Sequence, residues 1–585
     1  MAAMAVVVVV FFVAAALVAA GGAALVEHTF VVSQVKLNRL CNDMLVTVVN
    51  GQFPGPAIEV KEGDSVAVQV INKSPYGLTI HWHGVKLQLN CWADGAGMIT
   101  QCPIQPNKNF TYRFNVTGQE GTLWWHAHVG SLRASIHGAL IIRPRSGSRS
   151  YPFPKPHKEI PIVIGEWWEM DLNQLDKNLR NGHLFDMPRV ATINGKPGDL
   201  DNCSGTVKDS NILKVEHGKT YLLRIVNAAM NSEYYLKIAG HRFTVVAADA
   251  NYVKPYTTDV IAIAPGETVD ALLVADAHPA GRYYIVAKAN QPPKPAIQIP
   301  VFISRGIVQY GDGPRKVEEK ALSDSASLIM APEMPDKHDA ATSFYFHGNL
   351  TSLQPQPVPA NVHEHLFYAL DASFVCREGE SSCNNATNMM GMVNNVSFQL
   401  PTTTPLLQAH YHGNTSSIGT LRELPDRAPR MFNYSETLEP TSKATSVRRL
   451  RYNATVEIVF QSPVLADTYA NPMHLHGHDF LVLAQGFGQY NAETDVATYN
   501  LVDPPVRNTV HVPLFGWAAV RFVTNNPVHS IFYLCGMNRC VVHALPFWAP
   551  LVVRHGGSIR GGERSNFGLD SSSASGRFSK LQDLQ

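Results

Sequence analysis

The chain has 585 residues, too many for one ordinary domain, since about 150 residues per domain is typical. Its formal net charge is +1 and only 16% of its residues are charged, so nothing in the composition points to nucleic acid or to an acidic partner. With 38 prolines and 42 glycines, the composition favours short strands joined by turns over long charged helices.

The N-terminal segment resembles a secretory signal. Residues 5–20 are an unbroken apolar run followed by small residues, which predicts a signal peptide at residues 1–25. No Lys or Arg precedes the run, so a membrane anchor is the alternative, although the run is short for a span. Sequons of the form N-x-S/T, dense enough to favour a secreted glycoprotein, occur at Asn72, Asn109, Asn115, Asn202, Asn349, Asn385, Asn395, Asn414, Asn433 and Asn453. We expect secretion to the extracellular space or apoplast, and no membrane contact after cleavage.

Apolar alternation typical of strands recurs in three blocks of the chain, at residues 26–145, 151–306 and 394–527. No long stretch has a clean helical period. The sequence therefore predicts an all-β protein of three consecutive β-sandwich or barrel domains. Residues 307–393, rich in Pro and Ser, are predicted to be a linker. Residues 528–585 are predicted to be an aberrant, disordered tail, since residues 554–585 are rich in Gly and Ser with few apolar side chains.

Histidines recur in three groups at a spacing of two residues. On a strand, side chains at i and i+2 point to the same face, about 6.6 Å apart, so each group can reach neighbouring metal ions. An isolated H-x-H is commonly an ordinary surface or core feature, but three groups in apolar settings indicate a metal site. Imidazole suits copper; zinc, the rival, normally takes four ligands, or three and a water. The candidate ligands are His81, His83, His126, His128, His474, His476 and His478.

These groups lie in the first and third blocks, so those two domains should build the site, with the second as a spacer or wall. The phrases HWHG, WADG, TQCPIQP, WWHAH and NPMHLHGHDF together resemble the multicopper oxidases, and closely the plant laccases, over residues 26–527. The resemblance implies three cupredoxin-like domains, a mononuclear type 1 copper in the third, and a trinuclear cluster between the first and third. It also implies that phenolic substrates give up single electrons at type 1, and that O2 becomes water at the cluster.

Carried over by position, the resemblance gives each histidine a role. It assigns His81 and His476 to the type 2 copper, and His474 to type 1. The type 3 pair would take His83, His126, His128 and His478. Asp94 resembles the acidic residue that assists proton delivery, and an ordinary solvated aspartate is the alternative.

The end of the third block departs from the family pattern N-P-G-x-W-x-x-H-C-H-x3-H-x3-G-[LM]. Asn526 and Pro527 begin this motif, but neither Cys535 nor Cys540 is flanked by histidines. The type 1 site therefore lacks its thiolate. Cys102 resembles a cysteine that the family pairs with one in a C-terminal tail absent here. Cys376 and Cys383 are a candidate local disulfide.

A shifted reading frame restores the missing motif. One permitted set of codons for Val541–Gly557, read after dropping the first base, gives W-F-M-H-C-H-F-G-R-H-S-S-C-G-M-A. This translation matches the family motif from its Trp onward, W-x-x-H-C-H-x3-H-x3-G-M, with every spacing present. We therefore hypothesise that the gene encodes, or recently encoded, a complete enzyme, and that the chain reads out of frame after Pro527. A retained intron, a frameshift and a gene-model error are the possible routes.

The sequence thus predicts a laccase-type multicopper oxidase, monomeric, with copper as cofactor and a small phenol and O2 as substrates. The chain as written is expected to be impaired. The alternatives are an inactive laccase-like copper-binding protein or pseudogene product, and an enzyme like the ascorbate oxidases, which differ mainly in substrate.

Overall fold

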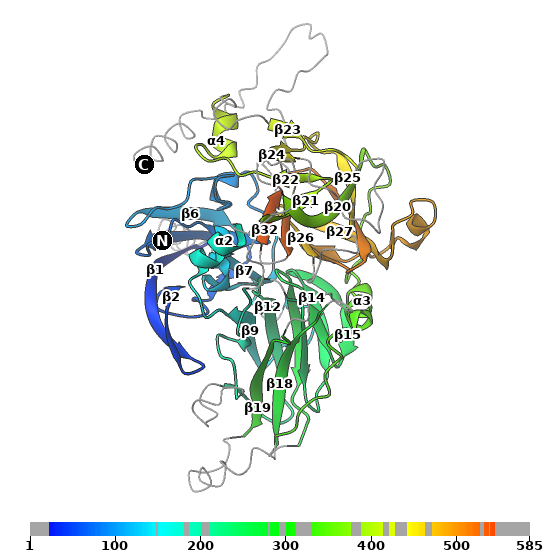
Figure 1. Cartoon of the computed structure of the whole chain (residues 1–585). Coiled ribbons are helices and arrows are strands. Elements are labelled where there is room, and N and C mark those ends of the chain that lie inside the picture. Colours follow the sequence, from blue (N-terminus) through cyan, green and yellow to red (C-terminus); the bar gives the residue numbers. More distant parts are fainter. Residues whose placement is uncertain are drawn as a thin grey trace, which may run out of the picture.

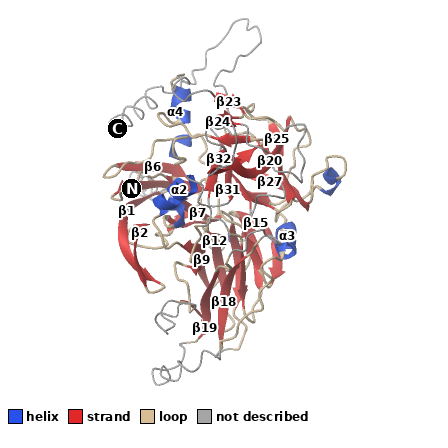
Figure 2. Cartoon of the chain, in the orientation of Figure 1, coloured by secondary structure: helices blue, strands red, loops and turns tan. Residues whose placement is uncertain are grey.

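The computed structural model describes most of the chain. The described residues are 23–147, 150–180, 186–199, 210–230, 232–278, 281–291, 300–311, 329–375, 388–413, 421–427, 442–462, 471–526, 532–536 and 539–543. Within them the chain is mostly strand and forms three units, each of two packed sheets (Figures 1 and 2). The predicted all-β class with three domains is confirmed. No helix in these ranges is long and apolar enough to span a membrane.

Domain 1 is a sandwich of two four-stranded sheets, drawn in blue and cyan in Figure 1. The first sheet, in the order β2-β1-β4-β6, consists of β1 Leu25–Arg39, β2 Asn42–Val49, β4 Ser65–Asn72 and β6 Asn109–Asn115. The second, in the order β3-β8-β7-β5, consists of β3 Ile58–Lys61, β5 Ile80–His83, β7 Gly121–Ala127 and β8 His137–Arg143. Side chains alternate across β6, whereas every residue of β5 and β7 is buried. The second sheet therefore has no solvent-facing side at β5 and β7.

Domain 2, green in Figure 1, packs a six-stranded sheet on a five-stranded one. The first, in the order β10-β9-β12-β17-β14-β15, has β9 Lys158–Trp167, β10 Val190–Ile193, β12 Thr220–Asn227, β14 Phe243–Ala248, β15 Asn251–Thr258 and β17 Thr268–Val274. The second, in the order β11-β19-β18-β13-β16, has β11 Asn211–Val215, β13 Tyr234–Ile238, β16 Ile261–Ile263, β18 Arg282–Ala289 and β19 Ile303–Tyr310. Helix α2, Leu172–Arg180, lies between β9 and β10 in the chain. The core between the sheets is the largest apolar cluster of the described residues.

Domain 3 packs a nine-stranded sheet on a four-stranded one. The larger, in the order β23-β24-β22-β21-β20-β25-β30-β27-β28, has β20 Glu364–Val375, β21 Asn388–Val393, β22 Val396–Phe398, β23 Leu421–Glu423, β24 Ser442–Val447, β25 Thr455–Gln461, β27 Phe480–Phe487, β28 Val506–Arg507 and β30 Gly516–Val523. The smaller, in the order β29-β26-β31-β32, has β26 Asn471–Leu475, β29 Thr509–Val512, β31 Phe532–Gly536 and β32 Arg539–His543. Helices α3, Ala340–Gly348, and α4, Leu406–Tyr411, join this part of the chain.

Two predicted boundaries differ from the structure. The linker predicted at 307–393 contains α3 and the paired strands β20 and β21. Its Pro- and Ser-rich composition gave no sign of these strands, which pair with each other and with β25. The tail predicted from residue 528 contains β31, which pairs antiparallel with β26, and β32, which pairs with β31. Residues 1–22 and residues 544–585 lie outside the described part.

Predictions about modification have mixed outcomes. Asn72 is fully buried and its amide donates to the Tyr76 and Ile104 carbonyls at 2.7 and 2.8 Å, so the folded chain cannot present this sequon to a glycosylating enzyme. The side chains of Asn109 and Asn115 are exposed. Cys102 is a free thiol, whereas the pair proposed at residues 376 and 383 lies outside the described residues.

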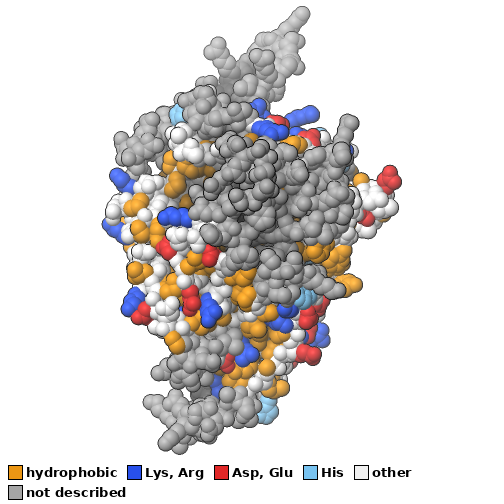
Figure 3. Space-filling view, in the orientation of Figure 1, with side chains coloured by type: hydrophobic (Ala, Val, Ile, Leu, Met, Phe, Trp, Pro, Cys, Tyr) orange, Lys and Arg blue, Asp and Glu red, His pale blue; other side chains and the backbone are white. Residues whose placement is uncertain are grey.

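On the face in Figure 3, side chains of both charges are interspersed, in keeping with the small net charge.

A buried ion cluster joins domains 1 and 2. Arg224, with no exposed side-chain surface, donates to Glu159 and Asp270 at 3.0 Å each, and also to Thr122 of domain 1 at 3.0 Å. Asp270 also accepts a short hydrogen bond from Thr122. Each carboxylate faces the guanidinium, so the opposite charges compensate one another inside the interface.

Replacing Arg224 by Ala should leave the buried Asp270 carboxylate without its cation, whereas Glu159 keeps Arg143 at 3.1 Å. We expect a loss of about 3–5 kcal/mol in the free energy of unfolding, seen as a lower thermal midpoint. The matched control is Lys36→Ala, which removes an ion pair whose side chains are 67% and 48% exposed and should leave the midpoint essentially unchanged. Equal midpoints for the two variants would contradict this account.

Candidate metal centre

The histidines of domain 1 converge because two buried strands pair. Strands β5 and β7 run antiparallel, with His81 opposite His126 in the register. Their ring centroids are 5.4 Å apart, and those of His83 and His126 are 5.6 Å apart. His128, just beyond the end of β7, lies 5.3 Å from the His81 ring. The predicted same-face arrangement at i and i+2 therefore brings these four rings together.

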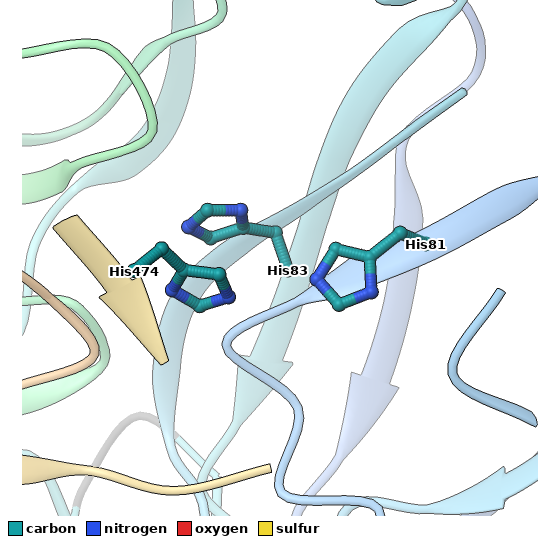
Figure 4. A group of neighbouring side chains, drawn as sticks. All are labelled: His81, His83 and His474. Carbon is teal, nitrogen blue, oxygen red and sulfur yellow. The ribbon is translucent and has the colours of Figure 1, made fainter. Parts of the chain in front are cut away.

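Two histidines of domain 3 complete the group. The ring of His474, in β26, stacks on His83 with a centroid distance of 3.6 Å (Figure 4). The ring of His476 stacks on His81 at 3.9 Å. One pocket at this junction of domains is lined by His81, His83, His126, His128, His474 and His476, together with Arg133, Pro265, Gly266, Pro472 and Thr509. We call these six histidines the histidine cluster.

His478 is the exception among the seven predicted ligands. The described residues that line the pocket do not include it, and its ring lies 5.9 Å from Phe522 instead. Strand β26 ends at Leu475 and Gly477 has φ of +71°, so the same-face rule for strands no longer applies at this point. The role of His478 as a ligand therefore stays a prediction, and its ring does not line this pocket. The assignment of His474 to a separate mononuclear site also stays a prediction, although its ring stacks on His83 inside the cluster.

Burial favours the neutral form of four imidazoles of the cluster. Burial, followed by the neighbouring imidazoles, holds the pKa values of His83 and His474 well below the usual histidine value. The pKa values of His126 and His128 are lowered well below that value in the same way, again chiefly by burial. Neutral imidazole is the form that binds a metal ion, so packing itself keeps these ligands ready for one.

Hydrogen bonds orient the rings and leave nitrogens for a metal. His81 Nδ1 donates to the Asp94 carbonyl at 2.8 Å, and His474 Nδ1 donates to the Asn508 carbonyl at 2.7 Å. Within the described part of the chain, the buried Nε2 atoms of His81 and His474 have no hydrogen-bond partner. Ligand atoms of His81, His83 and His474 lie within 4.8 Å of one another. Buried imidazole nitrogens that converge in this way fit a metal ion that prefers imidazole.

Asp94 lies inside the cluster and not in solvent. Its carboxylate, in a residue only 3% exposed, accepts from His476 Nδ1 at 3.0 Å and lies 3.3 Å from His81 Nδ1. Although burial favours the neutral acid, these two rings hold the pKa of the Asp94 carboxyl well below its usual range. The alternative reading of Asp94 as a solvated surface carboxylate is therefore wrong. His81, Asp94 and His476 form a second group of converging ligand atoms.

Domain 2 supplies part of the pocket wall, as expected for a spacer beside the site. Gly266 has φ of +91°, and a Cβ there would lie 3.2 Å from a His83 ring atom. Its carbonyl accepts from Trp124 Nε1 at 3.1 Å. Sequence analysis missed Gly266, Arg133 and Thr509, because none carries a metal-ligand side chain and only domain packing brings them here.

Comparison with known proteins agrees with this geometry. Models described as "Multicopper oxidase" match residues 31–147, 158–305 and 399–540. The chain is 56% identical to Laccase-15 of Oryza sativa subsp. japonica over 530 residues, covering 86% of this chain and 87% of that protein. It is 51% identical to Putative laccase-19 of Oryza sativa subsp. indica over 529 residues, covering 87% and 88%.

Two solved structures share the fold. A laccase from Botrytis aclada has a TM-score of 0.67 at 22% identity, covering 88% of this chain and 86% of that one. Fet3p, described as a multicopper oxidase that functions in iron import, has a TM-score of 0.69 at 20% identity, covering 89% and 90%. The chain belongs to the multicopper oxidase family, among the plant laccases, and is an oxidoreductase of the laccase type. The predicted resemblance is confirmed, and the family implies copper as the cofactor.

Gly95 tests how tightly Asp94 is held. A Cβ at this residue, which has φ of +76°, would lie 1.8 Å from the Ile80 carbonyl oxygen beside His81. Gly95→Ala should therefore displace Asp94 or β5, costing about 1–3 kcal/mol beyond the strain of left-handed backbone and lowering copper retention. Gly51→Ala is the control, since Gly51 has φ of +71° with nothing within 4 Å of its Cβ. Thermal midpoints and metal content measure the difference, and matching values for both variants would contradict it.

Proposed function

We propose that the histidine cluster holds copper and reduces O2 to water with electrons taken singly from phenols such as lignin precursors. The observation that carries the proposal is the convergence of six buried imidazoles from domains 1 and 3 on one pocket. Copper, when bound, would supply the one-electron steps. The apolar N-terminus and the sequons support action outside the cell, as a monomer.

The proposed ligand set is the six-histidine cluster, without His478. His81 and His474 would each offer Nε2, because Nδ1 of each is already committed to a backbone carbonyl. His83 and His476 stack on these two rings, and His126 and His128 complete the domain 1 side. Imidazoles alone at this density favour copper over zinc, whose sites are commonly closed by four ligands.

Asp94 and Arg133 are proposed to manage charge during the reaction. Asp94 is buried, ionised and in contact with His476 Nδ1, so it can hold that ring in one tautomer and take part in proton delivery. Arg133 lines the pocket and donates to the carbonyls of Ala229 and Met230 at 3.1 and 2.9 Å, which fixes its positive charge there. That positive charge would stabilise the negative charge that develops on O2 as it is reduced.

A second candidate is a copper-binding protein that does not oxidise phenols. It is favoured by the chain after Pro527, where no cysteine is flanked by histidines, so that no thiolate is placed to complete a type 1 site. Without that site, electrons from a phenol would lack their entry point. We propose that the chain as written is impaired for this reason. The likeness to laccases makes an activity like that of ascorbate oxidases the weaker alternative.

Copper retention in two histidine variants tests the ligand set. His474→Ala should lower copper affinity at least tenfold, because the ring faces the cluster, whereas His478→Ala should retain the metal. Metal analysis and copper electron paramagnetic resonance after dialysis against a weak chelator measure both, with circular dichroism as the folding control. Equal loss in the two variants would refute the proposed set, and a parent chain that holds no copper would refute the proposed function.

Colour and oxygen uptake test the impairment. The chain as written, loaded with copper, should lack the intense blue of a copper–thiolate bond and should not consume O2 with a methoxyphenol. A matched chain that carries the shifted-frame peptide after Pro527 should show both properties. Blue colour in the written chain would contradict the impairment, and a colourless, inactive matched chain would contradict the reading-frame hypothesis.

A further inference from the structure

One hairpin of domain 2 reaches the seam between domains 1 and 3. Asp249 and Ala250 form the two-residue turn between β14 and β15, with φ of +49° and +58°. Two positive φ values are the signature of a type I′ turn, in which Asp is favoured at the first position. A Cβ at Gly121, where β7 begins, would lie 2.7 Å from the Ala250 Cα. The turn therefore packs directly against the strand that carries His126.

The Asp249 carboxylate binds a segment of domain 3. Its Oδ2 accepts from Arg507 Nε at 2.9 Å, from Asn508 N at 3.2 Å and from Thr509 N at 3.1 Å. Its Oδ1 accepts from Thr268 N at 3.0 Å within domain 2. Asp249 and this domain 3 segment are buried, so water cannot replace these bonds.

The same domain 3 segment orients a ligand of the histidine cluster. The Asn508 carbonyl accepts from His474 Nδ1 at 2.7 Å, and Thr509 pairs with His474 in the ladder of β26 and β29. The Thr509 hydroxyl lies 3.2 Å from His474 Nδ1 and 2.9 Å from His83 Nε2. The backbone amides held by Asp249 thus belong to the two residues that touch these rings.

We propose that Asp249 is a positioning residue for the histidine cluster, acting through the 508–509 backbone on His474. The inference rests on the proposed copper site. Glu267 lies 2.9 Å from Arg507 Nη2, so a second carboxylate already compensates the charge of that arginine. Asp249 also supplies an acceptor for the Asn508 and Thr509 amides, which helps to fix the Asn508 carbonyl that orients the His474 ring. Groups of this kind, one step behind a ligand, tune metal affinity.

Asp249→Asn is the informative variant. Asn keeps the size and tolerates left-handed backbone, but it lacks the negative charge that draws three N–H groups to one oxygen. Asp270→Asn is the matched control, because Asp270 is also a buried carboxylate of domain 2 that serves an interface, with Thr122 and Arg224 as partners. Both variants should lower the thermal midpoint.

Two readouts separate positioning from general stability. In the metal-free protein, Asp249→Asn should raise the rate of amide hydrogen exchange in peptides covering residues 506–512, and Asp270→Asn should not. In the copper-loaded protein, Asp249→Asn should lower copper affinity about 10- to 100-fold and alter the copper resonance spectrum, while Asp270→Asn retains both.

The inference fails if exchange over residues 506–512 is unchanged in Asp249→Asn, or if it rises while copper affinity stays that of the parent. It also fails if Asp270→Asn loses copper equally. A parent chain without copper would instead defeat the proposed function, and the exchange measurement on the metal-free protein would still decide whether Asp249 holds this segment.

Discussion

The structure depends on burying six imidazoles inside one pocket between two domains. The His83 and His474 rings are buried and stack at 3.6 Å, so they could not both be imidazolium cations. Burial and mutual proximity therefore select the neutral, metal-binding form before any ion arrives. The cost of burying so many polar rings is offset by bonds from their Nδ1 atoms to fixed acceptors, such as the Asp94 and Asn508 carbonyls.

All three domains help to hold these rings, either by direct contact or through an intervening residue. Domain 1 contributes Asp94, whose backbone and carboxylate serve one histidine of its own domain and one of domain 3. Domain 2 contributes no ligand, yet Gly266 forms part of the pocket wall and Asp249 holds the domain 3 backbone behind His474. A mutation in domain 2 can therefore change the cluster without touching any ring. The candidate metal site therefore lies at the junction of the domains, and no single domain contains it.

How much of the site the sequence could reveal follows from its local geometry. The His81 and His126 groups were predictable because each lies in or beside a buried strand, where i and i+2 share a face. The same rule does not extend to His478, because β26 ends at Leu475 and Gly477 after it has a left-handed backbone. The three-domain fold was readable from apolar alternation, whereas the linker boundary was not. Contacts such as Asp94 with His476, 382 residues apart, depend on domain packing and leave no local pattern.

The end of the chain shows why fold and chemistry can separate. Strand β31 pairs antiparallel with β26, with residue 533 opposite His474, although the peptide after Pro527 does not match the family motif. A sheet edge accepts any extended segment whose amides meet its own, so the place beside β26 can be occupied by segments of different sequence. A copper–thiolate site has no such tolerance, since it needs one sulfur and two imidazoles at fixed positions. The backbone sheet can thus form from a segment whose sequence departs from the family motif.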